Sequence, residues 1–303
     1  MPLRIYAYPP EGAALLRLLD DAPLQRIGRS AECEVRIEHT SISRQHAELR
    51  CSDGVWLLAD SGSKNGVRVD GKSVATVELR APLWCAIGDV YCRLEPLSTD
   101  EAMSARMQDA ARRSVSRSLS AGLHAELGID QLLTRALAAV LELSGLERGF
   151  VLFGAQADSM RVRACHALDA RDLTGAGFAG SVGAVERSLR EGRSVICGDV
   201  GTAPWLGARA SVRLGGFRAL ACVPMQAAQQ LLGVVYADSR KPGLPLTELD
   251  QEMIESVAQQ AAAALSAAQL RADMEELIAA SAALGAHAPR WEDVRRAHAR
   301  GLA

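Results

Sequence analysis

Aromatic residues are scarce in this chain of 303 residues, at 4% of the sequence. Proteins that hold single-stranded nucleic acid stack its bases on aromatic side chains, so this scarcity disfavours such a platform. The formal net charge is −2, which gives no basic field for nucleic-acid binding. No apolar run reaches the roughly 18 residues of a membrane span, and the alanine-rich run 261–268 is both short and interrupted by Ser266. We therefore expect no membrane-spanning segment.

The seven cysteines are scattered, and no Cys-x-x-Cys pair occurs. An odd number of scattered cysteines, most of them inside apolar runs, is typical of reduced core residues in a cytoplasmic protein. The first six residues already resemble a strand and contain no apolar signal segment. We therefore expect a cytoplasmic protein with no metal site and no cofactor.

No motif for bond-breaking chemistry stands out in the sequence. Gly66–Ser73 matches the letters Gly-x-x-x-x-Gly-Lys-Ser/Thr of the phosphate-binding loop of ATPases, but it contains a short expected strand and the Asp70-Gly71 turn instead of leading into a helix, so no ATPase is expected. No Ser/His/Asp set and no pair of carboxylates is evident, and acids such as Asp199 and Asp238 fit loops and strand ends. The chain is therefore not expected to be an enzyme.

Length and composition favour two domains, because 49% apolar residues supply enough material for two cores. Residues 1–97 are β-rich, with turn signals such as Asp53-Gly54 and Asp70-Gly71 between short strands. This pattern predicts a sandwich or a barrel. The expected strands are Leu3–Tyr8, Leu24–Gly28, Val35–Ile37, His46–Cys51, Val55–Ala59, Val67–Val69, Val77–Leu79 and Val90–Leu94.

The pattern becomes helical after residue 97, and residues 98–126 are expected to form a helical linker with a helix over 100–122. Residues 127–270 then alternate between helices and apolar strands, which predicts an α+β domain with terminal helices on one side of its sheet. Its last helix is expected over 247–284. A C-terminal helix and a basic tail occupy 271–303.

Three polar clusters fall between the strands of the N-terminal domain. They are Arg26–Ser30, Ser41–Ala47 and Asp60–Gly66, and they contain guanidinium groups, hydroxyls and an amide. Charge-assisted hydrogen bonds from such groups suit an anion that is held beside a peptide backbone. The clusters therefore indicate recognition of an anionic ligand.

The ordered motifs Gly28-Arg29, Ser43-Arg44-Gln45-His46 and Asn65-Gly66 resemble the signature of the forkhead-associated (FHA) domain. Val67 stands where the family often has threonine. The resemblance implies an all-β sandwich that binds a phosphothreonine peptide. The implied ligand-binding residues are Arg29, Ser43, Arg44, Ser63, Lys64 and Asn65, and the implied supports of the site are Gly28, His46 and Gly66.

The resemblance also implies a role for each of these residues. Arg29 and Ser43 are expected to hold the phosphate, and Arg44 adds a second cation at the rim. Asn65 is expected to pair with the main chain of the ligand, because an amide both donates and accepts. His46 is expected to support the loop rather than touch the ligand.

Four stretches resemble the GAF domain, a small-molecule sensor or interaction module: Glu147–Phe153, Gly192–Ile196, Arg218–Met225 and Leu232–Asp238. The resemblance implies an α+β fold with an antiparallel sheet and flanking helices. The Asn-Lys-Phe-Asp type set of cyclic-nucleotide-binding members is absent, and Cys165-His166 fits ordinary strand sequence. The expected lining of a pocket is Trp205, Arg213 and Phe217, for a ligand that the sequence does not identify.

Loss of ligand binding, which leaves a dimerisation module, is an alternative interpretation of this domain. The helices 100–122 and 247–284 are long and alanine-rich, as symmetric helical interfaces can be. A homodimer is therefore expected, although both helices could instead pack only on their own sheet.

An FHA domain followed by a GAF domain resembles the sensory half of bacterial enhancer-dependent (sigma-54) transcription regulators. The tail from Trp291 resembles the first helix of a Fis-type helix-turn-helix, but no recognition helix follows it. The leading hypothesis is a non-catalytic signalling protein that binds a phosphothreonine partner, either a Ser/Thr kinase or its substrate. The alternative is a DNA-binding regulator, in which case the chain must continue past Ala303.

Overall fold

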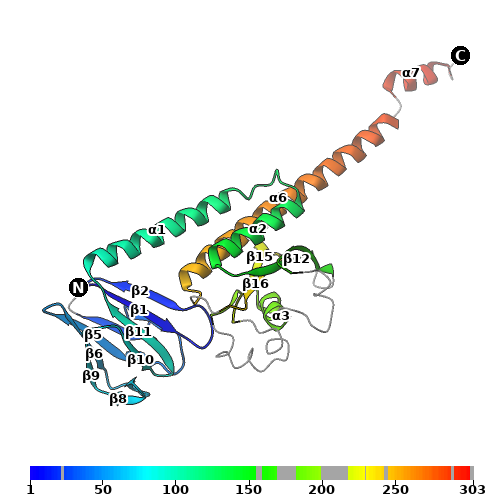
Figure 1. Cartoon of the computed structure of the whole chain (residues 1–303). Helices are drawn as coiled ribbons and strands as arrows, with labels where there is room; N and C mark the ends of the chain where they lie inside the picture. The colour runs from blue at the N-terminus through cyan, green and yellow to red at the C-terminus, as the bar shows by residue number, and fades with distance from the viewer. Residues whose placement is uncertain are drawn as a thin grey trace.

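The computed structural model describes residues 1–21, 24–154, 159–168, 182–198, 218–228, 230–241, 245–287 and 290–300, the side chains of 282–287 excepted. An N-terminal β-sandwich and an α+β domain lie side by side, and a long helix projects from the second (Figure 1). The fold is therefore multidomain, as the sequence predicted.

The N-terminal domain consists of a six-stranded and a five-stranded sheet. The six-stranded sheet has the order β2-β1-β11-β10-β7-β8, and its strands are Leu15–Leu19, Leu3–Tyr8, Val90–Pro96, Leu83–Ile87, Val67–Val69 and Lys72–Val74. The five-stranded sheet has the order β4-β3-β5-β6-β9, and its strands are Val35–Arg36, Gln25–Gly28, Ala47–Ser52, Val55–Asp60 and Thr76–Leu79. Two separate sheets make the domain a sandwich rather than a barrel.

Strict alternation along the strands explains how the two sheets share one core. In β1, Leu3, Ile5 and Ala7 are buried, whereas the residues between them point outward. The inward side chains of both sheets, among them fully buried Trp56 and Ile27, form one hydrophobic cluster. Burying these side chains drives the two sheets together.

The sequence did not predict β2, β8 and β10. In β2 the run Leu15–Leu19 is buried only at its two ends, so it lacks the alternation that reveals a half-buried strand. The two predicted hairpin turns are present. Asp53 and Gly54 have φ of 52° and 76°, and Asp70 and Gly71 have φ of 50° and 77°, which are the positive values of a tight two-residue turn.

Helix α1, Thr99–Ala121, follows the sandwich in the region predicted as a linker helix. Ser98 and Glu101 form a capping box, which fixes the start of the helix. Only Ala102 and Ser116 are buried along α1, so most of its surface faces solvent. Ion pairs from Arg112 to Asp250 and from Arg113 to Glu252 hold it against helix α6 (Glu248–His287).

The second domain has a five-stranded antiparallel sheet of order β13-β12-β16-β15-β14. These strands are Arg161–His166, Arg148–Phe153, Gln230–Ser239, Ala219–Ala227 and Val195–Cys197. Helices α2 (Ile129–Ser144) and α6 (Glu248–His287) cover one face, and α3 (Val182–Glu191) packs on the other. This arrangement is the α+β architecture that the sequence predicted.

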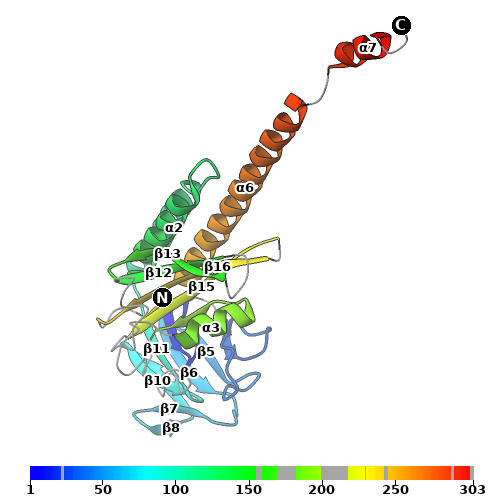
Figure 2. The same cartoon turned by 90° about the vertical axis from the view of Figure 1, so that its right-hand side faces the viewer.

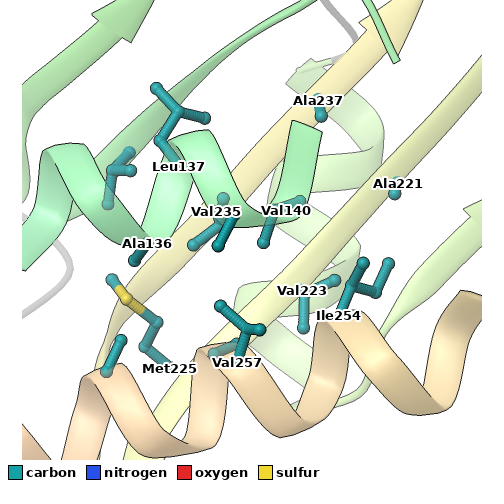
Figure 3. Close-up of a cluster of buried hydrophobic side chains, with 14 of the residues drawn as sticks. Ala136, Leu137, Val140, Ala221, Val223, Met225, Val235, Ala237, Ile254 and Val257 are labelled. Atoms are coloured by element: carbon teal, nitrogen blue, oxygen red, sulfur yellow. The ribbon is translucent and has the colours of Figure 1, made fainter. Parts of the chain in front are cut away.

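Figure 3 shows the core between the sheet and the two helices. Val223, Met225 and Val235 of the sheet meet Val140 of α2 and Ile254 of α6. Alanines at many other positions of this cluster let the helices approach the sheet closely, because they carry only a methyl group. The alanine-rich composition of α6 is therefore explained in part by packing on its own sheet.

The β1–β2 connection of the sandwich docks on the segment that begins α6. The Ala14 N–H donates to the Leu246 carbonyl over 2.7 Å, and the Glu248 N–H donates to the Ala14 carbonyl over 2.9 Å. Arg17 adds an ion pair to Glu248 at 2.8 Å. The start of α6 is thus attached to the sandwich through main-chain hydrogen bonds.

The second half of α6 leaves the body of the protein, and α7 (Trp291–Arg300) lies beyond its end (Figure 2). Leu270, Met274, Leu277 and Ile278 of this projecting part are all more than 60% exposed. None of the helices in the described ranges is both long enough and apolar enough to cross a membrane.

Candidate functional site

The three polar clusters of the sequence form adjoining loops of the sandwich. Main-chain hydrogen bonds join two of them, from the Arg29 N–H to the Ser43 carbonyl at 2.9 Å and from the Ser30 N–H to the Arg44 carbonyl at 3.1 Å. Gly28 makes this close approach possible, because a Cβ on it would lie 2.2 Å from the Arg44 carbonyl oxygen. The glycine is therefore required by the contact between the loops.

His46 lies under the loops with none of its surface exposed. Its Nδ1 accepts the Ser43 N–H at 3.0 Å, so this nitrogen carries no proton. Its Nε2 must then carry the proton and donates to the Gly66 carbonyl at 3.1 Å. A neutral imidazole thus joins the second loop to the third.

Ser43 lies between these loops with its side chain partly exposed. Its Oγ accepts the main-chain N–H of Lys64 at 3.0 Å. A hydroxyl that accepts one hydrogen bond still has its own proton to donate. The Ser43 side chain is therefore oriented by protein and can donate outward.

Asn65 bonds to the second loop through its amide, which donates from Nδ2 to the Ser41 carbonyl at 2.7 Å. The Ser41 hydroxyl accepts the Asp89 N–H at 2.8 Å, so the turn between β10 and β11 supports the same loop. The Asn65 carbonyl oxygen and its second amide hydrogen make no bond within the described part of the chain. One side of the amide can therefore pair with a ligand backbone.

The third loop is shaped by Asp60. One carboxylate oxygen accepts the N–H groups of Gly62 and Ser63, each at 3.1 Å, and the other accepts the Ser63 hydroxyl at 2.6 Å. The Ser63 Oγ accepts the Gly66 N–H at 2.9 Å. The hydroxyl of Ser63 is thus used within the loop, and this residue shapes the site.

Three residues that adjoin Ser43 in sequence or through main-chain hydrogen bonds carry exposed cations: Arg29, Arg44 and Lys64. Among the described residues, no carboxylate lies within ion-pair distance of any of them. The Arg29 Nε donates to the Ile42 carbonyl at 3.3 Å, which orients its guanidinium group. Unpaired cations beside a donating hydroxyl form an electropositive site for an anion.

The sequence assigned no role to Ser41, Asp60 or Asp89, although each supports this site. An Asp followed two and three residues later by loop N–H groups is the pattern of an Asx-type turn, which could have revealed Asp60. No local signal could have revealed Asp89, because its contact with Ser41 spans 48 residues.

In the second domain, the expected pocket residues Trp205, Arg213 and Phe217 lie outside the described residues. The sheet face toward α3 carries Phe150 stacked on Tyr236 at 4.9 Å and a buried ion pair from Arg148 to Asp238 at 2.6 Å. Burial raises the pKa of the Asp238 carboxyl, and the hydrogen bond from Arg148 opposes that rise. Cys165 is an exposed residue of β13 paired with Phe150.

The chemistry available at the loop site is binding. Its groups are cations, a hydroxyl donor, an amide and backbone N–H groups, and its histidine is buried and bonded on both nitrogens. Within the described ranges, no three His, Cys, Asp or Glu side chains gather as a metal site requires. The fold and this site define a modular protein in which a β-sandwich with an exposed cationic loop site precedes an α+β domain.

Comparison with known families agrees with this division. The family model described as the FHA domain matches residues 25–82, and that described as the GAF domain matches residues 126–266. The protein therefore contains an FHA domain followed by a GAF domain, which confirms the two resemblances predicted from the sequence. The resemblances of the whole chain to sigma-54 regulators and of its tail to a Fis-type helix remain predictions.

The relatives with matching sequence share the FHA part of the chain. The oxoglutarate dehydrogenase inhibitor of Corynebacterium diphtheriae is 36% identical over 72 residues, which cover 20% of this chain and 50% of that protein. The glycogen accumulation regulator GarA of Mycolicibacterium smegmatis is 32% identical over 80 residues, which cover 23% of this chain and 51% of that protein. The chain thus spans about half the length of each relative.

Among solved structures, the FHA-1 domain of Mycobacterium tuberculosis Rv1747 is 28% identical, with a TM-score of 0.27. The match covers 31% of this chain and 97% of that domain.

Proposed function

We propose that this protein is a non-catalytic regulator whose FHA domain binds phosphothreonine in a partner protein, either a Ser/Thr kinase or one of its substrates. The observation that carries the proposal is the Ser43 hydroxyl, which Lys64 orients by its main-chain N–H and which lies among unpaired cations. A phosphate group offers several strong acceptor oxygens and about −2 charge, which matches these donors.

The roles of the site residues follow from their contacts. Arg29 and Ser43 bind the phosphate, and Arg44 adds charge at the rim. Asn65, with one amide hydrogen and its carbonyl oxygen free, pairs with the peptide main chain on one side of the phosphate. Lys64 is exposed and contributes to peptide preference, whereas Ser63, Gly28, His46 and Gly66 maintain the loops.

Two relatives with matching FHA regions support a regulatory role, because their names describe an enzyme inhibitor and a regulator of glycogen accumulation. Neither name describes catalysis. We therefore place the protein in a cytoplasmic signalling pathway, where its FHA domain provides the input.

Titration of the full chain with matched threonine and phosphothreonine peptides from a degenerate library tests this proposal. Arg29→Ala and Ser43→Ala should each weaken binding by on the order of 1.5–3 kcal/mol, because each removes a hydrogen bond to a charged group. Arg36→Ala is the matched control, since Arg36 is an exposed cation of the same domain that pairs with Glu38. Failure of all phosphopeptides to bind, or equal affinity of both variants and wild type, would refute the proposal.

The same protein is proposed to act as a homodimer through the projecting half of α6. Leu270, Met274 and Leu277 follow the four-then-three spacing of a coiled-coil seam, and Ile278 lies beside them. Within the described part of the chain this stripe has no covering element, since all four side chains are more than 60% exposed.

Analytical ultracentrifugation of the full chain measures this association. Leu277→Glu should convert dimer to monomer, because it places a charge in the seam. Ala279→Glu adds the same charge on the opposite side of the helix and should leave the dimer intact. A wild-type chain that sediments as a monomer at all accessible concentrations would contradict the dimer.

A further inference from the structure

Four of the twelve aromatic residues of this chain share one exposed surface. Three of its four tyrosines, Tyr6, Tyr8 and Tyr91, lie with Trp84 on the outer face of the six-stranded sheet. Tyr91 is 67% exposed and Trp84 is 52% exposed. Large exposed aromatic side chains that gather on one face mark a binding surface more often than scattered ones do.

The strand register brings these side chains together. Tyr8 lies directly opposite Tyr91, and the Trp84 ring stacks on Tyr8 with centroids 5.7 Å apart and an interplanar angle of 23°. The Arg93 guanidinium lies 6.0 Å from the Trp84 ring centroid and covers part of it. The rings are therefore held in a fixed arrangement before any ligand arrives.

A cavity of about 420 Å³ adjoins these rings, where the sandwich meets the GAF domain. Its lining includes Tyr8, Pro9, Pro10, Trp84, Tyr91 and, from the GAF side, Pro245. Its volume falls within the range of about 300–1,000 Å³ that is typical of ligand sites. We call the surface formed by Tyr8, Pro9, Pro10, Trp84 and Tyr91 the aromatic groove.

The charges around the aromatic groove are paired with one another. Arg4 and Arg93 bond to Glu95 at 2.7 and 3.3 Å, and Arg68 lies 3.6 Å from Asp89. A charged occupant would have to compete with these pairs. The groove therefore favours a neutral occupant.

The polar groups of the rings indicate what kind of neutral occupant fits. Within the described part of the chain, the hydroxyls of Tyr8 and Tyr91 and the indole N–H of Trp84 make no hydrogen bond to protein. A polyproline II segment leaves its carbonyl groups free, because that helix has no internal hydrogen bonds. Its prolines also stack on aromatic rings at low entropic cost, as they do in other aromatic-lined grooves.

We propose that the aromatic groove binds an uncharged, proline-rich segment of a partner protein in the polyproline II conformation. The proposal does not depend on phosphate recognition, because the groove and the phosphate site use different side chains. The two sites are nevertheless adjacent. The Asp89 N–H, in the turn that ends beside the groove, bonds to Ser41 of the loop that carries Ser43.

The test is a titration of the full chain with an unphosphorylated, uncharged peptide of repeated Pro-x-x-Pro units. Tryptophan fluorescence and calorimetry measure the binding. Saturable binding with a Kd below about 1 mM is expected. Trp84→Ala and Tyr91→Ala should each weaken it at least about tenfold, since stacking and a hydrogen bond are lost together. Trp291→Phe, which changes an exposed tryptophan of α7, should leave affinity unchanged.

The two proposed sites are separated by further controls. Arg29→Ala should retain proline-peptide binding, and Trp84→Ala should retain both its unfolding temperature and its phosphopeptide affinity, which shows that the variant is folded. Absence of saturable binding would overturn the proposal. So would equal affinity for a peptide in which every proline is alanine, or wild-type affinity in both groove variants.

Discussion

The two domains place their charged groups in opposite ways. In the FHA domain, Arg29, Arg44 and Lys64 project from loops into solvent, and main-chain hydrogen bonds position those loops. In the GAF domain, the Arg148–Asp238 ion pair lies on neighbouring strands and is almost completely buried. Exposed charges contribute little to stability and are available to a ligand, whereas buried charges are costly to unpair. Substitutions should therefore affect mainly binding in the first domain and mainly stability in the second.

The largest expected effect on stability comes from Arg148→Met. The change leaves the Asp238 carboxylate buried without its partner, which should lower the free energy of unfolding by about 3–5 kcal/mol. The loss should shrink at acid pH, because protonation of Asp238 removes the uncompensated charge. Urea unfolding measures both effects. Arg163→Met is the control: it removes a more exposed ion pair with Asp130 and should lower the free energy of unfolding by no more than about 1 kcal/mol. Equal losses in the two variants would contradict the difference between buried and exposed charges.

A smaller loss of stability, together with a loss of binding, is expected for His46→Ala. The substitution leaves the Ser43 N–H and the Gly66 carbonyl without their buried partner, at on the order of 2–4 kcal/mol for the two groups. Phosphopeptide affinity should fall at least about tenfold, because Ser43 loses its support. His124→Ala changes an exposed histidine and should alter neither the stability nor the phosphopeptide affinity. Wild-type phosphopeptide affinity in His46→Ala would show that the loops hold their shape without the imidazole.

Gly28→Ala should act on binding more than on stability. Its new Cβ meets the Arg44 carbonyl oxygen and the Cys33 Sγ, so the loop that carries Arg44 must move. Overpacking of this kind costs about 1–3 kcal/mol. Gly128→Ala is the control, because nothing lies within 4 Å of its Cβ position. Thermal unfolding and the phosphopeptide titration check the pair, and a variant that binds normally would mean that the close approach of the loops is dispensable.

The smallest expected effect concerns Glu147 at the surface of the GAF domain. Hydrogen bonds from Lys241 and Ser239 lower the pKa of its carboxyl from 4.5 to about 2. The stability that the ionised Glu147 carboxylate contributes is therefore fully present above pH 4.5. It is lost as the pH falls from 4.5 through about 2. Glu147→Gln should flatten the pH dependence of urea unfolding in that window. Glu142→Gln, at an exposed position of α2, should leave that pH dependence unchanged. The prediction would be contradicted if the unfolding free energy of Glu147→Gln varied with pH as it does in the wild type.

The sequence predicted the fold class and the order of the domains, because their signals are local. Alternating residues such as Leu3, Ile5 and Ala7 reveal a strand, and Asp53-Gly54 reveals its turn. The motif residues Arg29, Ser43 and Asn65 lie on adjoining loops, as the FHA resemblance implied, although their roles remain proposals. Strand β2 was missed because its Leu-rich run does not alternate.

Other features could not be predicted from local patterns. The Ser41–Asp89 hydrogen bond and the stacking of Tyr8 on Trp84 join residues far apart in the chain, and only the tertiary fold brings them together. The alanine-rich helix over 247–284 was interpreted as a dimer interface. The structure divides that helix into a first half that packs on its own sheet and a second half with an exposed apolar stripe.

The attachment of the sandwich to the beginning of α6 has a mechanical consequence. A helix of 40 residues is about 60 Å long, and the first half of α6 is fixed both to Ala14 by a hydrogen bond and to the GAF sheet by its core packing. A tilt of about 5° at that end would displace the far tip by about 5 Å, which is roughly one helical turn. A small rotation of the GAF domain, which carries α6, against the FHA domain would therefore be amplified at the far end of α6.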